Sequence, residues 1–478
     1  MQSHHVDVAI IGAGTAGLAA YRAARAAGQR VLLIEAGKLG TMCARSGCMP
    51  SKLLLAAAHG LHDAQALAPR GIQGGKEVRA DGRAVMAYVR AERDRFVAGV
   101  IDDLHAFPEG TVLRGLARFV SDHVLVVNHS HEVHARSVVI ATGAAPSIPT
   151  ALDVFGDFAI TSEAIFEWDT LPQSAAVLGA GPVALELGQA LARLGVRVQI
   201  FGRNGDAANL TDPVVRDALV LTLQEDIYLD TDAEILEMKM HEGKPAIRYR
   251  VLDGDEATSR FDVVIAATGR QPALDHLQLE NTTLRLDARG IPEHNPATLQ
   301  CGMSSIFVAG DCDGTRPWLA DASDEGTIAG TNAARYPDIK RYPRKTPMSV
   351  VFCEPQAAQV GASFASLDPR RIVIGEVAFA NQGRSRIMRR NHGKLRIYAD
   401  GDTGRVLGAE GCGPDIEHLA HLIAWGVQLE LTIDQMIAMP YYHPVVEEGL
   451  RSALLHARKQ LGARRPLPEL LFATTFHA

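Results

Sequence analysis

Two cysteines in the segment TMCARSGCMPSK, Cys43 and Cys48, are of a type and spacing that could do redox chemistry. At this separation a regular helix points the two side chains to different faces, so closing a disulfide ring requires a locally irregular turn at Cys43. A strained, accessible bridge is readily reduced, which suits a catalytic disulfide. Two buried thiols or a pair of metal ligands are the alternatives. Metal sites usually bring a second such pair, which the sequence lacks, so we expect no metal.

A glycine-rich turn precedes the cysteines. Residues 6–11, VDVAII, are typical of a short apolar strand, and Gly12, Gly14 and Gly17 follow at once in GAGTAG. A helical stretch and a second strand, which ends at Glu35, complete the unit. The glycines allow a tight turn and close approach to a pyrophosphate, and the carboxylate can bind a ribose hydroxyl. The pattern predicts a dinucleotide site.

The same unit occurs a second time. The stretch AAVLGAGPVALELG gives a strand, a glycine turn and a helix, and the strand VRVQIF follows it. Each unit later closes with an ATG turn, so the chain carries one fold element twice and implies two dinucleotide cofactors. The candidate cofactor residues of the second turn and of the two ATG turns are Gly179, Gly181, Ala184, Thr142, Gly143 and Gly269.

These patterns predict an α/β protein with two Rossmann-like nucleotide-binding domains and a C-terminal α+β domain. We expect a first domain over residues 1–149 with the cysteines, and a second over residues 150–272. The strand in SSIFVAGD, which ends at Asp311, should return to the first domain, so residues 273–345 form its second part. Residues 346–478 show mixed strands and helices without a nucleotide signature and predict a dimerisation domain.

Length, composition and charge exclude several classes of protein. The chain has 478 residues, too many for one core, with 47% apolar and 22% charged residues. A net charge of -7 gives no electrostatic reason to expect nucleic acid or a membrane surface as partner. Six cysteines do not make a disulfide scaffold. The chain lacks an apolar run of transmembrane length, and its first lysine or arginine is Arg22, which leaves no positive start for a signal peptide, so we expect a cytoplasmic protein.

The ordered motifs GAGTAG, CARSGCMPSK, GAGPVALE, AATGRQP, FVAGD and YYHPVVEE resemble those of the pyridine nucleotide-disulfide oxidoreductases over essentially the whole chain. Within that family the chain looks most like the dihydrolipoyl dehydrogenases. The resemblance implies FAD, bound tightly but not covalently along Gly12, Gly14, Gly17 and Glu35, with Asp311 on its ribityl chain. It also implies NAD or NADP as co-substrate and a homodimer whose active site both subunits share.

The resemblance also assigns catalytic roles. Cys43 corresponds to the thiol that exchanges with the substrate, and Cys48 to the thiolate beside the flavin. Lys52 and Glu186 correspond to an ion pair near the flavin. The base that activates the thiol corresponds to His443, and Glu448 orients it. In the family this base comes from the partner subunit.

Individual residues of the sequence also allow other functions. After the strand VRVQIF, where NAD sites usually carry an acidic residue, Arg203 stands and could pair with the 2′-phosphate of NADP. This favours an alternative, an NADPH-dependent reductase of a low-molecular-weight disulfide, similar to glutathione reductase. A non-enzymatic flavoprotein should lack the cysteines or the base. Mercuric reductase and large thioredoxin reductase are disfavoured because the tail PELLFATTFHA has no cysteine pair.

Overall fold

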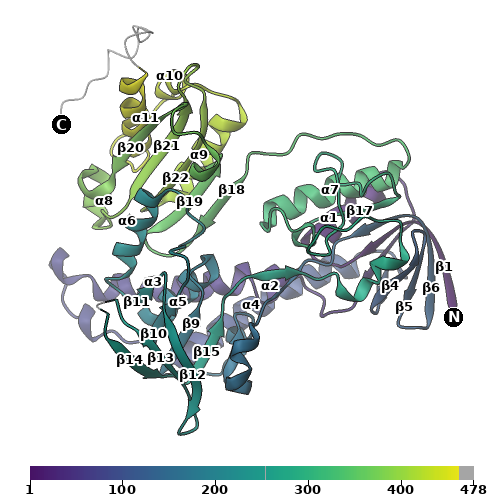
Figure 1. Ribbon diagram of the computed structural model, residues 1–478, viewed down its shortest axis with the longest axis horizontal. Helices are drawn as coiled ribbons and strands as arrows, with labels where there is room; N and C mark the ends of the chain where they lie inside the picture. Colours follow the sequence, from purple (N-terminus) through teal and green to yellow (C-terminus); the bar gives the residue numbers. More distant parts are fainter. Residues whose placement is uncertain (253, 462–478) are drawn as a thin grey trace.

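The computed structural model describes residues 1–252 and 254–461, so the tail PELLFATTFHA lies outside the described residues. The described residues form three large sheets with helices packed on them, and a small antiparallel ribbon beside the second sheet (Figure 1). They also form one two-stranded sheet. This is the α/β class that the sequence predicts, and the two glycine-turn units occupy separate sheets.

The first sheet has the strand order β3-β2-β1-β6-β5-β4, and β17 pairs with β6. Strand β17 is the segment expected to return from later in the chain. The register aligns Ile11 of β1 with Ile34 of β2 and Ile140 of β6, so the carboxyl ends of these parallel strands lie level. The strands are β1 (Gln2–Ile11), β2 (Val31–Glu35), β3 (Val112–Arg114), β4 (Ala117–Ser121), β5 (Val124–Val127), β6 (His131–Ile140) and β17 (Ile306–Val308).

Helices α1 (Thr15–Ala26) and α7 (Leu319–Arg335) cover one face of this sheet side by side (Figure 1). They approach closely because glycines face the partner backbone: a Cβ on Gly326 would lie 2.1 Å from the Ala16 carbonyl oxygen. A core of small and aliphatic side chains fills the space between helices and sheet. The first turn of α1 is thereby fixed at the carboxyl ends of the strands.

The second sheet is parallel, with the order β11-β10-β9-β15-β8. Helices α5 (Pro182–Arg193) and α6 (Pro213–Leu223) belong to this unit. Its strands are β8 (Ala159–Thr161), β9 (Ser174–Leu178), β10 (Arg197–Phe201), β11 (Tyr228–Asp230) and β15 (Val263–Ala266). The antiparallel ribbon beside it contains β12 (Ile235–His241), β13 (Lys244–Arg250) and β14 (Glu256–Arg260), and a two-stranded pair joins β7 (Ala144–Pro146) to β16 (Arg270–Pro272).

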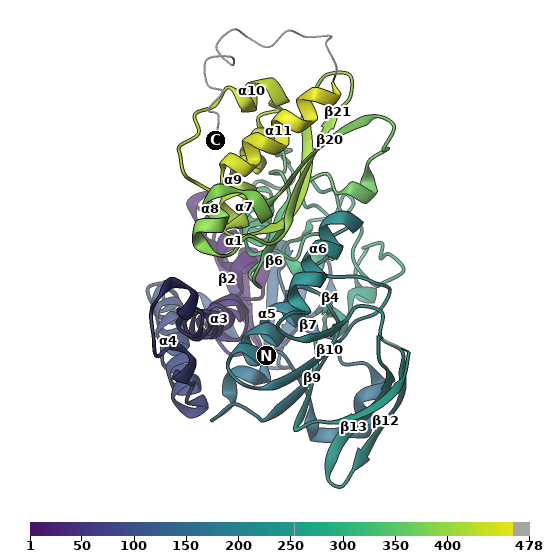
Figure 2. The same ribbon diagram turned by 90° about the vertical axis from the view of Figure 1, so that its left-hand side faces the viewer.

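The third sheet is antiparallel, in the order β18-β19-β22-β21-β20, and helices pack on it (Figure 2). The apolar side chains of this unit form a separate core. Its strands are β18 (Met348–Val351), β19 (Gln356–Gly361), β20 (Ile372–Ala378), β21 (Lys394–Asp400) and β22 (Val406–Gly413). Its helices are α8 (Gly383–Met388), α9 (Ile416–Gln428), α10 (Ile433–Ile437) and α11 (Glu448–Gln460).

Three helices follow β2 and form the insertion in the first unit: α2 (Met42–Arg45), α3 (Cys48–Gln65) and α4 (Gly82–His105). Apolar side chains of α3 pack into the same core as α5 and the second sheet. Short 3-10 helices occupy connections: η1 (Ala68–Arg70), η2 (Gly75–Glu77), η3 (Thr150–Phe158), η4 (Ala164–Glu167), η5 (Asp275–Leu277), η6 (Leu279–Asn281), η7 (Asp311–Asp313), η8 (Phe364–Ser366) and η9 (Phe379–Asn381).

Candidate active site

A cavity of about 640 Å³ opens at the level carboxyl ends of β1, β2, β6 and β17. The residues that leave these strands line it, and so do residues of α2 and the first residue of α3. Among the residues singled out from the sequence, the cavity is lined by Gly12, Gly14, Glu35, Cys43, Cys48, Thr142, Gly143 and Asp311. One site therefore unites the first glycine turn with the cysteine pair.

The three glycines of the first turn differ in what a side chain at their position would contact. Gly12 has φ +109°, and a Cβ there would lie 2.2 Å from the Ala141 carbonyl oxygen. Gly17 lies behind the cavity, where a Cβ would lie 1.8 Å from the Gly12 carbonyl oxygen. Gly14 begins α1 without a side-chain cap and has open space around its Cβ position. The free N-terminus of α1 thus faces the cavity and favours an anionic group.

Gly17→Ala should therefore lower the stability of the protein, whereas Gly14→Ala should lower its affinity for the flavin. The Gly17→Ala change places a methyl group against the backbone of Gly12, so we expect a loss of about 1–3 kcal/mol in the free energy of unfolding. The Gly14→Ala change should leave the urea midpoint of the flavin-free protein unchanged but lower the flavin content of the purified protein, because the methyl group enters the space used by a pyrophosphate. Urea unfolding and flavin absorbance measure both effects, and equal destabilisation by the two changes would contradict this reading.

The polar groups of the cavity suit a dinucleotide. Glu35 ends β2, and its carboxylate lies 2.6 Å from the backbone nitrogens of Ala13 and Gly37, at the place for a ribose. The Thr142 hydroxyl is buried, and Thr142 lines the cavity. Burial raises the pKa of Asp311, while nearby Arg270 opposes that shift. The residues present fit FAD, with a carboxylate, a helix N-terminus and a hydroxyl at one cavity.

The cysteine pair sits at a break between two helices. Cys43 lies in α2, Gly47 has a non-helical backbone, and Cys48 begins α3. The irregular backbone therefore lies between the two cysteines, at Gly47, and not at Cys43 where the spacing led us to expect it. The structure has both residues as free cysteines. Hydrogen bonding from Cys43, helped by the charge of Lys52, lowers the pKa of Cys48 to about 7. Hydrogen bonding to Cys48 and burial raise the pKa of Cys43.

Lys52 and Glu186 form an ion pair that joins the two nucleotide-binding units. The Lys52 Nζ lies 2.7 Å from Glu186 Oε2, and the Glu186 side chain is only 8% exposed. Phe352, which the sequence did not single out, completes the contact: its ring lies under the ammonium, 4.6 Å from Nζ, and its backbone nitrogen donates to Glu186. Lys52 is one helical turn from Cys48, so its charge acts on the thiol pair.

His443 and Glu448 form a pair as well, but away from the cavity of their own chain. The imidazole Nδ1 lies 3.0 Å from Glu448 Oε1, and the side chain of His443 is 79% exposed. Because a carboxylate only accepts, Nδ1 donates and Nε2 is free to take a proton. Neither residue lines the cavity, so the chain alone does not bring this base to the cysteines.

The second glycine turn repeats the geometry of the first. Gly179 has φ +109°, and a Cβ there would lie 2.4 Å from the Ala267 carbonyl oxygen. Gly181 begins α5 without a side-chain cap, and Ala184 is buried in that helix. Gly269 has φ +113°. Arg203 is exposed just beyond β10. These residues lie outside the cavity that holds the cysteines and form a second candidate nucleotide site.

Residues 1–252 and 254–461 contain no candidate for a metal site and no candidate for a membrane-spanning helix. No group of three or more His, Cys, Asp or Glu side chains there could hold a metal ion. Within the same ranges, no helix combines the length and the apolar character needed to cross a bilayer.

Comparisons with known proteins agree with this geometry. The family model described as pyridine nucleotide-disulphide oxidoreductase matches residues 6–334, and that of its dimerisation domain matches residues 347–454. Dihydrolipoyl dehydrogenase of Bacillus subtilis is 28% identical, over 94% of this chain and 98% of its own. Mercuric reductase of Shigella flexneri is 29% identical, over 94% of this chain and 80% of its own.

A solved structure of the HOCl-induced flavoprotein disulfide reductase RclA from Escherichia coli superimposes with a TM-score of 0.78 at 23% identity, over 94% of this chain and 99% of that chain. At this level of identity, the likeness concerns the fold alone. The two family models together cover both nucleotide-binding units and the antiparallel C-terminal unit. The chain belongs to the pyridine nucleotide-disulphide oxidoreductase family, whose members bind FAD and use NAD(P)H.

Proposed function

We propose that this protein is a dithiol oxidoreductase of the dihydrolipoyl dehydrogenase type, which oxidises a dihydrolipoyl dithiol and reduces a nicotinamide nucleotide. The observation that carries the proposal is the position of Cys43 and Cys48 in the cavity that the first glycine turn also lines. Bound FAD supplies a two-electron carrier between the thiols and the nicotinamide.

The two thiols have different roles in this proposal. One substrate sulfur attacks Cys43 of the oxidised Cys43–Cys48 pair, forms a mixed disulfide and releases Cys48 as the thiolate. The second substrate sulfur then displaces Cys43, so the substrate leaves as a disulfide and both enzyme cysteines are reduced. The lowered pKa of Cys48 and the raised pKa of Cys43 support this division, since the better leaving group is the more acidic thiol.

The exchange requires a base, and His443 is the candidate. Glu448 fixes its Nδ1, so Nε2 can take the proton of the substrate thiol. Because His443 lies outside the cavity of its own chain, the proposal requires a second copy of the chain to supply it. The match to the family's dimerisation domain supports this arrangement.

A second candidate, an NADPH-dependent reductase of a low-molecular-weight disulfide, rests on Arg203. Its guanidinium is exposed after β10, and no hydrogen bond or ion pair occupies its side chain within the described part of the chain. It is therefore available for a 2′-phosphate. Arg45 lies between the two cysteines, where an arginine side chain could bind a substrate carboxylate. Its Nε donates to the Leu39 carbonyl oxygen, which weakens the case for a glutathione-like substrate.

Steady-state assays that pair NAD and NADP with dihydrolipoamide, and NADH and NADPH with oxidised glutathione, distinguish the candidates. We expect dihydrolipoamide oxidation to exceed glutathione disulfide reduction by at least about a hundredfold in kcat/KM, because a site built for one disulfide loses several kcal/mol with another. Preferential turnover of glutathione disulfide with NADPH would overturn the proposal and establish the second candidate. Mercuric ion with NADPH serves as a third arm, since mercuric reductases are equally similar in sequence.

A further inference from the structure

The loop of residues 202–212 connects β10 to α6, carries Arg203 at its start and has no regular secondary structure. It lies against the second glycine turn, because the backbone nitrogen of Ala208 donates to the carbonyl oxygen of Ala180 at 3.0 Å. Several of its residues have positive φ, namely Asn204, Gly205, Ala208 and Asn209. Alanine disfavours this conformation, so contacts outside the loop must hold its shape.

The end of this loop is held by Glu410 of β22, a fully buried residue of the third sheet. Glu410 Oε2 accepts hydrogen bonds from the backbone nitrogens of Thr211 and Asp212 at 2.7 and 2.8 Å. Its Oε1 accepts from the Thr211 hydroxyl at 2.5 Å and from the backbone nitrogen of Phe364 at 2.9 Å. Of these donors only Phe364 belongs to the third unit, so the carboxylate joins the loop to a separate part of the fold.

Asp212 strengthens the same junction. It is fully buried and caps the N-terminus of α6, where it accepts from the backbone nitrogen of Val214 at 3.0 Å. Arg396 of β21 lies with Nη1 2.7 Å from both of its carboxylate oxygens, and the Tyr398 hydroxyl donates to it at 2.9 Å. Helix α6 accordingly packs against β21 and β22 (Figure 1, Figure 2). The third unit thus fixes both the last residues of the loop and the helix that follows.

We propose that Glu410 is a positioning residue for the nicotinamide nucleotide: it holds loop 202–212, and with it Arg203, in the shape that binds the adenosine part of NAD(P). The inference rests on the proposed function, which assigns the second glycine turn to this co-substrate. In this type of fold the ribose of the nucleotide binds where the strand after the glycine-turn helix ends, which is where the loop begins. A carboxylate of the third unit therefore sets the geometry of the nucleotide site in the second.

Glu410→Gln keeps the size of the side chain but removes one of its two acceptors. A carboxamide has one oxygen and one NH2 group, so one of the two positions must present hydrogens to its neighbours. Each position now receives a backbone N–H, from Thr211 and Asp212 at Oε2 and from Phe364 at Oε1. A buried N–H that faces another donor is costly, so the end of the loop must shift.

Steady-state oxidation of NADH and of NADPH by the holoenzyme, with an artificial dye as acceptor, tests the inference. In Glu410→Gln we expect KM for the preferred nucleotide to rise by about tenfold, the factor for a loss of binding energy comparable to one hydrogen bond. The kcat should stay within about twofold of the unmodified protein, because the flavin and its surroundings are unchanged. The flavin content of the purified protein should be unchanged as well.

Glu354→Gln is the matched control. Glu354 also belongs to the third unit and pairs with Arg193, which lies at the opposite end of α5 from the glycine turn. This change removes a contact between the same two units without touching loop 202–212, so we expect an unchanged nucleotide KM. A general loosening between the units would instead raise KM in both variants.

An unchanged nucleotide KM in Glu410→Gln, or an equal rise in the Glu354→Gln control, would overturn the inference. If Glu410→Gln does not fold, Thr211→Val and Thr211→Ser decide the question, since valine removes the hydroxyl that donates to Glu410 and serine keeps it. We expect a raised KM with valine and a normal one with serine, and equal values would overturn the inference. The assay uses no dithiol, so an unmodified protein that oxidises neither nucleotide would refute the nicotinamide site itself, and the inference with it.

Discussion

Serine in place of Cys43 or Cys48 is expected to lower kcat/KM for dithiol oxidation by about 1,000-fold or more, because a hydroxyl cannot take part in disulfide exchange. Transfer from NAD(P)H to an artificial dye should persist in both variants, since that reaction needs the flavin and the nicotinamide site but no thiol. Coupled assays with dihydrolipoamide and with a dye measure the two activities separately.

Cys412→Ala provides the control for this result. Cys412 is a fully buried thiol outside the cavity, so its removal should leave dithiol turnover within a few-fold of the unmodified protein. A Cys48→Ser enzyme with normal dithiol turnover would show that the pair is not the route of the electrons.

The second large effect concerns the base. His443→Gln should lower dithiol turnover by about 100-fold to 10,000-fold, the range for loss of a general base, and leave dye reduction largely intact. The expected split follows from the geometry, because the imidazole is held by Glu448 but lies outside the flavin cavity of its own chain. Paired kcat measurements with dihydrolipoamide and with the dye test it.

His418→Asn is a suitable comparison, since His418 is also an exposed imidazole beside a glutamate. It should change neither activity. Equal loss of dithiol and dye turnover in His443→Gln would argue for a structural defect and against a base. Mixing Cys43→Ser and His443→Gln subunits should restore part of the dithiol activity if the base comes from a second copy.

Much of the first unit could be predicted from the sequence because local patterns encode it. The spacing of Gly12, Gly14 and Gly17 is imposed by backbone contacts, and Glu35 follows from the length of one strand–helix–strand unit. The cysteine spacing predicted an irregular backbone near the pair, although the break occurs at Gly47 and not at Cys43. Such residues are close in sequence to the features that explain them.

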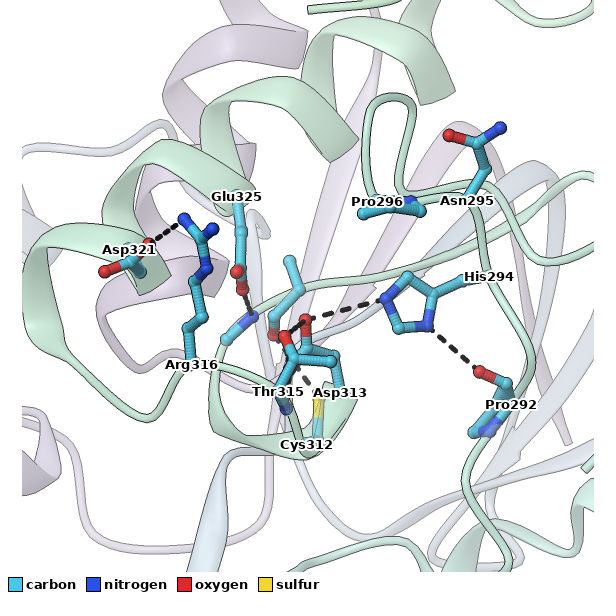
Figure 3. A network of polar contacts seen from close by, with 12 residues as sticks. Pro292, His294, Asn295, Pro296, Cys312, Asp313, Thr315, Arg316, Asp321 and Glu325 are labelled. Atoms are coloured by element: carbon cyan, nitrogen blue, oxygen red, sulfur yellow. Dashed lines mark hydrogen bonds and ion pairs between the residues drawn. The ribbon is translucent and has the colours of Figure 1, made fainter. Parts of the chain in front are cut away.

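Other parts of the site depend on contacts between distant segments. Phe352 meets Lys52 only because α3 packs into the core of the second unit. His294 and Asp313 lie on separate segments and carry no motif, so only the fold brings them to within 3.6 Å of each other (Figure 3). In the proposed function, a second subunit brings His443 to the cysteines, and no pattern within one chain can place that subunit.

Anaerobic reduction of the intact protein with dihydrolipoamide tests the central claim most directly, namely that Cys48 serves as a thiolate beside FAD. We expect a long-wavelength charge-transfer absorption band whose intensity rises with pH through about 7, because Cys48 is protonated below that pKa. Cys43→Ser should show the band without any reductant, and Cys48→Ser should never show it. A fully flavin-loaded, reducible enzyme that gives no such band at any pH would contradict the account.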